Sequence, residues 1–460
     1  MNIYMNKKRV WIGLSVLFLG FTIIHFTNMD YLIYCGKVVL SIVVALLIFF
    51  TQFQGVLSLY QVMISLLGLF KNKKMYRVEN ELESTRFAVL VCAHNEESVI
   101  GQIIQSLKKM DYPKEKYDIH VICDNCTDGT AQIVRKAGVN AWERQDPQKR
   151  GKGYGLEWMF QNLFCLEKEN KKVYDAVVIL DADNIVSRNF LQVLNYKLVA
   201  EKYEVIQAYL DSKNPTDNWI SKSYAIAYWS TNRLYQFSRG KLGLSAQLGG
   251  TGMCFSMQVL KEIGWGTQSL TEDLEFTAKY IFTKGKSVGW AHEAKIFDEK
   301  PTDFKVSFRQ RVRWMQGHMD CMVRYSVPLL KNFLQTFNIN ALDMCIYLIQ
   351  PTRTMLSVNS IILFCLTYYE LLPSYIMPYV LSPWIWLMIA LSFYLLPIIA
   401  LIQEKQIKNV IWTPIVYIFG FSWVPIILLG FIKRKQKVWV HTPHNRVMDK
   451  EKMLKMEELT

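Results

Sequence analysis

The chain has 460 residues, of which 51% are hydrophobic, and a formal net charge of +14 at pH 7. This composition is too apolar for an ordinary soluble enzyme and too polar for a chain that lies wholly in a membrane, so we expect membrane segments beside a soluble domain. The positive charge suits an anionic membrane leaflet or an anionic substrate, but no nucleic acid is expected as a partner, because no basic stripe with interleaved aromatic residues is present.

Two apolar runs begin the chain, at residues 11–27 and 38–69. Each is long enough, or nearly so, to cross a bilayer. Lysine and arginine residues flank the outer ends of the pair, whereas the expected connecting loop carries only Asp30 and Lys37. Basic residues stay on the cytoplasmic side, so we predict a transmembrane hairpin over residues 1–75 with both ends in the cytoplasm. A signal peptide is the competing interpretation, but no clear cleavage site follows the first run.

The next segment, residues 84–300, has the rhythm of an α/β domain. Apolar strand-like runs alternate with runs whose apolar residues recur at helical spacing: strands at 87–97, 117–125 and 174–184, and helices at 98–110 and 130–138. This alternation predicts a parallel sheet that is covered by helices on both faces. In such sheets, ligands bind at the carboxyl ends of the strands.

Three of the predicted strands end in polar clusters: His94-Asn95-Glu96, Asp124-Asn125 and Asp181-Ala182-Asp183. We expect these clusters to converge on one crevice. The two aspartates of the last cluster are spaced to bring two carboxylates near one hard cation such as Mg²⁺ or Mn²⁺, although two solvated loop carboxylates are the plainer interpretation.

A Cys-x-x-Cys pair, Cys123 and Cys126, flanks Asp124. Such a pair can bind zinc or perform redox chemistry, but zinc needs further ligands and a redox pair normally opens a helix. We interpret the cysteines as two small side chains beside a turn.

Two further segments each allow two interpretations. Lys152 lies between glycines in "KRGKGYG" (149–155), which is not a Walker A sequence. It either reaches a diphosphate or belongs to a flexible basic turn. The acids of "SLTEDLEF" (269–276) either suit the N-terminus of a helix or include a general base.

The segment "RQRVRWMQGH" (309–318), read as a helix, places Gln310, Arg313, Trp314 and Gly317 on one side. A guanidinium suits phosphate oxygens, and an indole face suits a sugar or a base. A basic helix resting on the membrane surface is the alternative, and we predict amphipathic interfacial helices over residues 301–340.

Three more apolar runs follow, at roughly 340–369, 376–402 and 410–432, and then a basic cluster. We predict a transmembrane bundle over residues 341–432 and a cytoplasmic basic tail over 433–460. An even number of crossings keeps this cluster inside, so one run is interfacial or re-entrant, or the first run is broken near its proline.

Four motifs together resemble the family 2 glycosyltransferases: Asp124, Asp181-Ala182-Asp183, Thr271-Glu272-Asp273 and Gln310-Arg311-Val312-Arg313-Trp314. Their order, and the order of membrane and soluble segments along the whole chain, is similar to that of the membrane-integrated processive synthases of cellulose, hyaluronan, chitin and poly-N-acetylglucosamine. The resemblance implies a GT-A fold, the Rossmann-like α/β fold of nucleotide-diphospho-sugar transferases, over residues 84–300.

The resemblance also implies a role for each matching residue. It assigns nucleotide-sugar binding to Asp124, Lys152, Asp181, Gln310 and Arg313. It assigns acceptor binding to Gly250, Thr251, Gly252 and Trp314. Asp183 is expected to hold Mg²⁺ or Mn²⁺ on the diphosphate, and Asp273 is expected to be the general base.

The implied function is that of a multi-pass plasma-membrane enzyme with a cytoplasmic catalytic domain. It would polymerise a UDP-hexose, glucose or N-acetylglucosamine, into a β-linked polysaccharide with inversion, and extrude the product. Its partners would be the UDP-sugar donor, the growing polysaccharide, membrane lipids and export proteins on the outer face. Two alternatives remain: a non-processive transferase that adds one sugar to a lipid or glycan, and a non-catalytic transport or scaffold protein.

Overall fold

The computed structural model describes residues 29–70, 82–169, 171, 173–352, 365–366, 368–369, 383–436 and 448–458. The chain divides into two units, Met1–Val56 with Leu356–Trp386, and Leu57–Met355 with Leu387–Thr460. The predicted apolar run at 11–27 lies outside the described residues, as do parts of the runs at 340–369 and 376–402 and of the tail at 433–460.

The larger unit contains an α/β domain. Its strands are β1 Phe87–Ala93, β2 Tyr117–Asp124, β3 Asn140–Arg144, β4 Ala176–Asp181, β5 Ile185–Val186, β6 Val205–Ser212, β7 Met253–Ser256 and β8 Gly289–Asp298. Its helices are α3 Ile100–Lys108, α4 Thr130–Lys136, α5 Lys152–Lys168, α6 Phe190–Val199, α7 Trp219–Thr231, α8 Ser238–Leu242, α9 Met257–Ile263 and α10 Glu272–Lys284. A 3₁₀ helix, Lys114–Lys116, and a π-helix, Asn232–Phe237, complete it.

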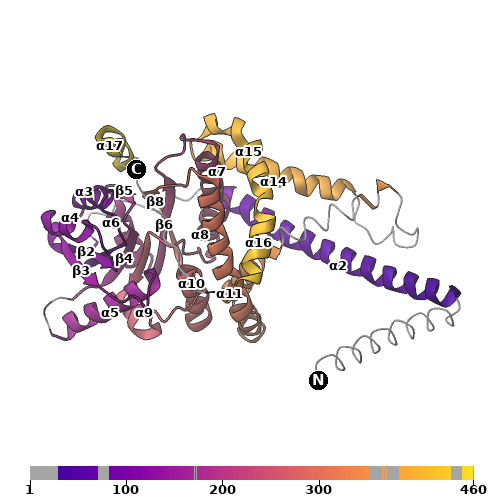
Figure 1. Cartoon of the computed structure of the whole chain (residues 1–460), viewed down its shortest axis with the longest axis horizontal. Coiled ribbons are helices and arrows are strands. Elements are labelled where there is room, and N and C mark those ends of the chain that lie inside the picture. The colour runs from indigo at the N-terminus through magenta and orange to yellow at the C-terminus, as the bar shows by residue number, and fades with distance from the viewer. Residues whose placement is uncertain are drawn as a thin grey trace, which may run out of the picture. The chain divides into compact units, whose positions relative to one another are not determined.

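Further helices precede or follow this domain (Figure 1): α2 Met29–Phe70, α11 Phe304–Thr336, α12 Ile339–Leu348, α14 Pro383–Gln403, α15 Thr413–Phe421, α16 Trp423–Ile432 and α17 Lys450–Glu457. A 3₁₀ helix, Ile407–Trp412, leads into α15. The predicted interfacial segment at 301–340 is therefore mainly one helix of 33 residues, which begins where the Asp303 side chain accepts a hydrogen bond from the Val306 N–H.

The eight strands form one sheet in the order β3-β2-β1-β4-β7-β6-β8-β5. The predicted parallel arrangement is confirmed for β3, β2, β1 and β4. The rest of the sheet is mixed. β6 and β8 are parallel to each other, but the prediction is wrong at β7, which runs antiparallel to both β4 and β6, and at β5, which runs antiparallel to β8. Because β7 is antiparallel to β4, it begins near the carboxyl end of β4. The loop before β7 therefore lies at the edge of the sheet where the predicted polar clusters end their strands.

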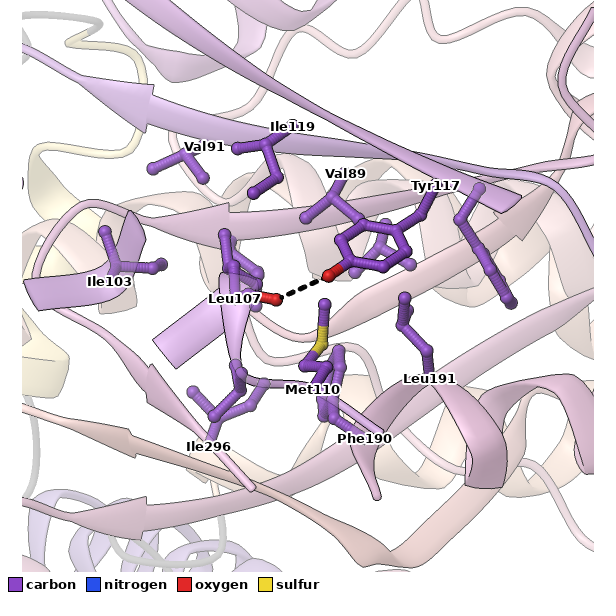
Figure 2. Packing of buried hydrophobic residues seen from close by; sticks show 14 of the residues in the cluster. Val89, Val91, Ile103, Leu107, Met110, Tyr117, Ile119, Phe190, Leu191 and Ile296 are labelled. Atoms are coloured by element: carbon purple, nitrogen blue, oxygen red, sulfur yellow. Dashed lines mark hydrogen bonds between the residues drawn. The ribbon is translucent and has the colours of Figure 1, made fainter. Parts of the chain in front are cut away.

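Side chains alternate across β1 and separate two cores. Val89 and Val91 lie in a cluster with residues of α3, α4 and α6, whereas Ala88 and Leu90 lie in a second cluster with residues of α5, α9 and α10. Figure 2 shows the first cluster, in which the Tyr117 hydroxyl donates to the carbonyl oxygen of Leu107 at 3.0 Å. Alternate burial on both faces is what holds an α/β sheet between two helical layers.

Two helices among the described residues are long and apolar enough to cross a membrane, Ser41–Leu69 and Ile407–Ile432. They coincide with the predicted runs at 38–69 and 410–432. The predicted loop that carries Asp30 and Lys37 is wrong, since both residues lie inside the first turns of α2. That stretch holds no proline and only one glycine, so nothing local interrupts the helix.

Candidate active site

The carboxyl end of β2 supplies Asp124. Its Oδ1 accepts hydrogen bonds from Arg144 Nη1 at 2.5 Å and from Asn125 Nδ2 at 3.1 Å. Asn125 is in the left-handed region, with φ of 52°, and its N–H donates to the Arg144 carbonyl oxygen at 2.7 Å. Asparagine tolerates this conformation better than most residues do. The turn therefore holds a buried carboxylate against a guanidinium from the neighbouring strand.

The two cysteines beside Asp124 serve the same turn. Cys123 is buried within β2, and the Cys126 thiol donates to the carbonyl oxygen of Ala93 at 3.6 Å. Across the described residues, no group of three or more His, Cys, Asp or Glu side chains is gathered closely enough to hold a metal ion alone.

Lys152 begins helix α5 directly after Gly151, whose φ of 121° favours glycine. The Lys152 ammonium forms an ion pair with Asp181 at the end of β4 and donates to the Gly250 carbonyl oxygen at 2.6 Å. Burial opposes its charge, but the nearby Asp181, Cys92 and Glu272 side chains together outweigh burial and raise the pKa of Lys152. Lys152 is therefore a fixed cation in the site and not part of a surface turn.

The loop before β7 is held against β4. Asp181 N–H donates to Thr251 Oγ1 at 3.1 Å, and Gly252 N–H donates to the Ile179 carbonyl oxygen at 2.8 Å. Gly250 and Gly252 have φ of 84° and 64°, and a Cβ at Gly252 would overlap the Ile296 side chain. These glycines are thus required both for the backbone conformation and for the close approach of the loop.

Asp273 lies opposite this loop, in the first turn of α10. Its Oδ2 is 3.6 Å from the position that a Cβ at Gly250 would occupy. Burial and the charge of Glu272 raise the pKa of Asp273 to about 7, against the opposing charge of Lys152. A carboxylate that titrates near neutral pH is suited to accept a proton from a hydroxyl group.

Glu275, two residues after Asp273 in α10, has a different role. Its Oε2 accepts from the N–H groups of Gln268 and Ser269, both at 2.6 Å, and its Oε1 accepts from Arg324 Nη1 at 2.6 Å. Burial opposes ionisation, but the Arg324 hydrogen bond and these N–H groups lower the pKa of Glu275. Glu275 therefore fixes the loop that leads into α10.

Helix α11 crosses the start of α10 at Gly317. A Cβ at Gly317 would lie 2.7 Å from the Thr271 backbone nitrogen, and the Gly317 carbonyl oxygen accepts from Ser269 Oγ at 3.1 Å. A side chain at this position would force the two helices apart. The close crossing fixes the Thr271-Glu272-Asp273 and Gln310–Trp314 segments relative to each other.

Several polar side chains of α11 have a buried atom without a hydrogen-bond partner among the described residues, and Gln310 and Arg313 of the predicted site are two of them. Arg313 Nε and Gln310 Oε1 are buried and have no hydrogen-bond partner in the described part of the chain. Burial lowers the pKa of Arg313, although the nearby charges of Glu272, Asp181 and Asp273 oppose the change. A buried donor without a partner is costly, so these atoms are suited to a ligand that supplies the missing oxygen or N–H group.

Trp314 of α11 packs against aromatic side chains. Its ring meets Tyr224 edge-on at 6.3 Å and packs in a cluster with Ile220 and Phe419. The neighbouring Arg311 donates to Ser422 Oγ at 2.7 Å, which joins α11 to the segment between α15 and α16. The site is thus connected directly to Ile407–Ile432, the second helix that is long enough to cross a membrane.

Asp183 is buried in the short connection between the end of β4 at Asp181 and the start of β5 at Ile185. Its Oδ1 accepts from Asn184 Nδ2 at 3.0 Å, and its Oδ2 accepts from the Glu299 N–H at 2.8 Å. Burial, together with the charges of Asp183 and Asp181, raises the pKa of the adjacent Asp298 to about 6, although Lys300 opposes this. Carboxylate oxygens are the ligands that Mg²⁺ and Mn²⁺ prefer, and an ion held by Asp183 would need substrate phosphates and water to complete its coordination.

Residues 85–317, half of the chain, match the model of the family described as "Glycosyltransferase like family 2". The chain is a family 2 glycosyltransferase. The family is one of enzymes, which favours the two enzymatic alternatives over a transport or scaffold protein. The mixed α/β sheet, with its helices on both faces, confirms the predicted GT-A fold.

Curated relatives of this glycosyltransferase match over its catalytic domain. The chain is 27% identical over 270 residues to the probable glycosyltransferase YdaM of Bacillus subtilis, covering 55% of this chain and 60% of YdaM. It is 26% identical to the beta-monoglucosyldiacylglycerol synthase of Nostoc, covering 58% and 56%. It is 23% identical to the poly-beta-1,6-N-acetyl-D-glucosamine synthase of Staphylococcus epidermidis, covering 60% and 66%. The match thus spans somewhat more than half the length of each relative.

Among solved structures, the glycosyltransferase is similar to a mannosyltransferase from Pyrobaculum calidifontis in complex with GDP-Man and Mn²⁺. The TM-score is 0.48 at 15% identity, covering 82% of this chain and 98% of the other.

The structure brings together most of the site residues that the sequence of this glycosyltransferase predicts. Lys152, Asp181 and the Gly250–Gly252 loop are in direct contact, and Asp273 and Arg313 share their electrostatic surroundings. Trp314 is the exception, because its ring packs against Tyr224 and Phe419. The roles of all these residues stay predictions.

Sequence reasoning missed Arg144, Asp298 and Glu299. Arg144 holds Asp124 from the end of β3, Asp298 is the last residue of β8, and Glu299 follows it. The sequence "FDEKP" does place acids after an apolar strand, which is the same signal that identified Asp124 and Asp181. It could have found Asp298, but nothing in the sequence reveals that β8 ends beside Asp183.

Proposed function

We propose that the protein transfers a hexose from a UDP-sugar to an acceptor hydroxyl with inversion, and that Asp273 is the general base. The observation that carries this proposal is the position and pKa of the Asp273 carboxylate. The carboxylate lies near the Gly250 loop, which the Lys152–Asp181 ion pair contacts, and its pKa is raised to about 7. The proposed base, a cation and a glycine-rich loop are therefore close together.

In the proposed reaction, ionised Asp273 accepts the proton of the acceptor hydroxyl as its oxygen attacks the anomeric carbon. The bond from that carbon to the diphosphate oxygen breaks, and UDP leaves with the electron pair. Attack on the face opposite the leaving group inverts the carbon, so a UDP-α-sugar gives a β-linkage. Direct displacement needs one base and no covalent intermediate, unlike retaining hydrolysis by paired carboxylates.

The leaving diphosphate needs positive charge and hydrogen-bond donors. Lys152 is a fixed ammonium, and Arg313 has a buried N–H group that lacks a partner in the described residues. Preorganised donors of this kind stabilise charge as it develops. Mg²⁺ or Mn²⁺, held through Asp183 and the diphosphate, would supply further positive charge at the leaving oxygen. Asp124, fixed by Arg144, would contact the uracil or ribose.

We further propose that the acceptor enters or leaves on the membrane side of the site, and that the product is a β-linked polymer extruded by a multi-pass plasma-membrane enzyme. Support comes from Trp314, which packs against Phe419 of a helix long enough to cross a membrane, and from the resemblance of Gln310–Trp314 to the processive synthases. The donor would be UDP-glucose or UDP-N-acetylglucosamine. Membrane lipids and outer-face export proteins would be the partners.

Transfer of a single sugar to a lipid is a second candidate. The curated relatives include a monoglucosyldiacylglycerol synthase as well as a polysaccharide synthase, at similar identity. An acceptor path beside a membrane helix suits a diacylglycerol as well as a growing chain.

Product length separates the two candidates. The purified protein in lipid nanodiscs that contain diacylglycerol is incubated with Mn²⁺ and a panel of radiolabelled UDP-sugars. We expect UDP release, and labelled polymer that resists α-glycosidases. Label found only in a lipid with one sugar would exclude processivity.

Asp273→Asn tests the base itself. We expect UDP release to fall by about 10²–10⁴-fold, with unchanged thermal unfolding and unchanged binding of UDP. If Glu272→Gln abolishes turnover and Asp273→Asn does not, the base is the neighbouring glutamate.

A further inference from the structure

The C-terminal helix α17 packs against the catalytic domain, far along the chain from the residues that it contacts (Figure 1). Met453 and the partly buried Met456 of this helix, and Met448 just before it, pack in a cluster with Ile185 and Phe297. Ile185 and Phe297 are directly opposite each other in the antiparallel β5–β8 pair. The helix therefore covers one face of the ladder at the edge of the sheet.

Polar contacts fix the same helix in place. The Glu457 carboxylate is almost fully buried, with 1% of its side chain exposed, and accepts from Lys109 Nζ at 3.1 Å. The Glu457 carbonyl oxygen accepts from the Arg188 N–H at 3.0 Å, and Gln102 Nε2 donates to the Met448 carbonyl oxygen at 2.9 Å. A buried carboxylate needs a specific cation, so this docking has one defined geometry.

The ladder beneath α17 is the one that holds Asp183. β5 begins two residues after Asp183, and the Glu299 N–H that bonds the Asp183 carboxylate lies two residues after Phe297. β5 has only two residues and forms the sheet edge, so its pairing with β8 contributes little stability alone. Burial under α17 adds the apolar contacts that such a short strand lacks.

We propose that α17 is a positioning element for the donor site, in which Met453 and Glu457 hold the β5–β8 ladder and, through it, the Asp183 carboxylate. This inference rests on the proposed role of Asp183 at the diphosphate-bound metal ion. Met453 and Glu457 contact no substrate. Release of α17 would therefore weaken binding of the metal ion and the nucleotide while the base, on α10, keeps its place.

The chain offers a matched pair of variants for the test. Met453 is buried against the ladder, whereas its neighbour Leu454 is 39% exposed on the same helix. Full-length protein in nanodiscs is compared as wild type, Met453→Ala, Leu454→Ala and Met453→Leu. The measurements are the Kd of UDP with Mn²⁺, kcat and KM for the donor, and amide exchange at residues 183–188 and 295–299.

We expect Met453→Ala to weaken Mn²⁺-dependent UDP binding by about 10-fold or more, as altered supporting contacts do at metal sites. KM should rise with it, kcat should change little, and exchange should accelerate at both segments. Leu454→Ala should match the wild type, and Met453→Leu should restore binding. Glu457→Gln, which keeps the shape of the side chain, gives a second test if Met453→Ala folds poorly.

Two results would overturn the inference: equal UDP affinity in Met453→Ala and Leu454→Ala, or faster exchange without any loss of affinity. Failure of the proposed function is distinguishable, because the wild type itself would then bind no UDP in the presence of Mn²⁺, and Asp183→Asn would have no effect.

Discussion

The β-sheet side of the site and the helical side, formed by α10 and α11, differ in how completely their polar groups are paired. On the β-sheet side, each carboxylate already has a partner: Asp124 is paired with Arg144, Asp181 with Lys152, and Asp183 with backbone and amide N–H groups. On the helical side, buried atoms of Gln310 and Arg313 have no hydrogen-bond partner among the described residues. The pKa of Asp273 there is raised to about 7. The sheet side is organised by the fold, whereas the helical side is organised for a ligand.

The largest expected effect comes from Arg144→Ala, on the sheet side. It leaves the buried Asp124 carboxylate without its cation, and removal of one partner of a buried ion pair costs about 3–5 kcal/mol. We expect a lower midpoint of chemical unfolding together with loss of UDP binding. Retained stability would show that Asp124 does not depend on Arg144.

Arg313→Ala should give the opposite pattern. The Arg313 Nε is buried and has no hydrogen-bond partner among the described residues, so removal of this side chain from the ligand-free protein should leave the free energy of unfolding unchanged or slightly raised. Turnover should fall by about 10²–10³-fold, as for loss of a donor that stabilises transition-state charge. Kinetics and unfolding are measured on the same preparation, and a loss of stability equal to that of Arg144→Ala would contradict the comparison.

Gly317→Ala tests the joint between α10 and α11. A Cβ would meet the Thr271 backbone, and overpacking of this kind costs about 1–3 kcal/mol. We expect reduced turnover, because the Asp273 and Arg313 segments are moved apart. The control is Gly420→Ala in α15, where a Cβ meets nothing within 4 Å and stability should be unchanged or slightly higher.

The sequence predicts the sheet side of the site better than the helical side. Asp124 and Asp181 end apolar strands, and strands that alternate with helices bring such ends to one edge, so local pattern is enough. The antiparallel β7 has only four residues, and no local signal gives its direction, although that direction brings the Gly250–Gly252 loop to Asp181. The Gly317–Thr271 contact is tertiary, and only the resemblance indicated that its two segments act together.

The smallest effect concerns the pH dependence of the helical side. The Glu272 charge contributes to the raised pKa of Asp273, and the base acts in its ionised form. Turnover of the wild type should therefore fall as the pH drops through about 7. Glu272→Gln removes that negative charge, so the pKa of Asp273 falls and the acidic limb of kcat/KM moves to lower pH. Glu262→Gln, an exposed site on α9 beside Lys284, is the matched control and should leave the limb unmoved. If the acidic limb of kcat/KM does not move in Glu272→Gln, a group other than Asp273 accepts the proton of the acceptor hydroxyl. The contrast between the two sides of the site would then rest on Gln310 and Arg313 alone.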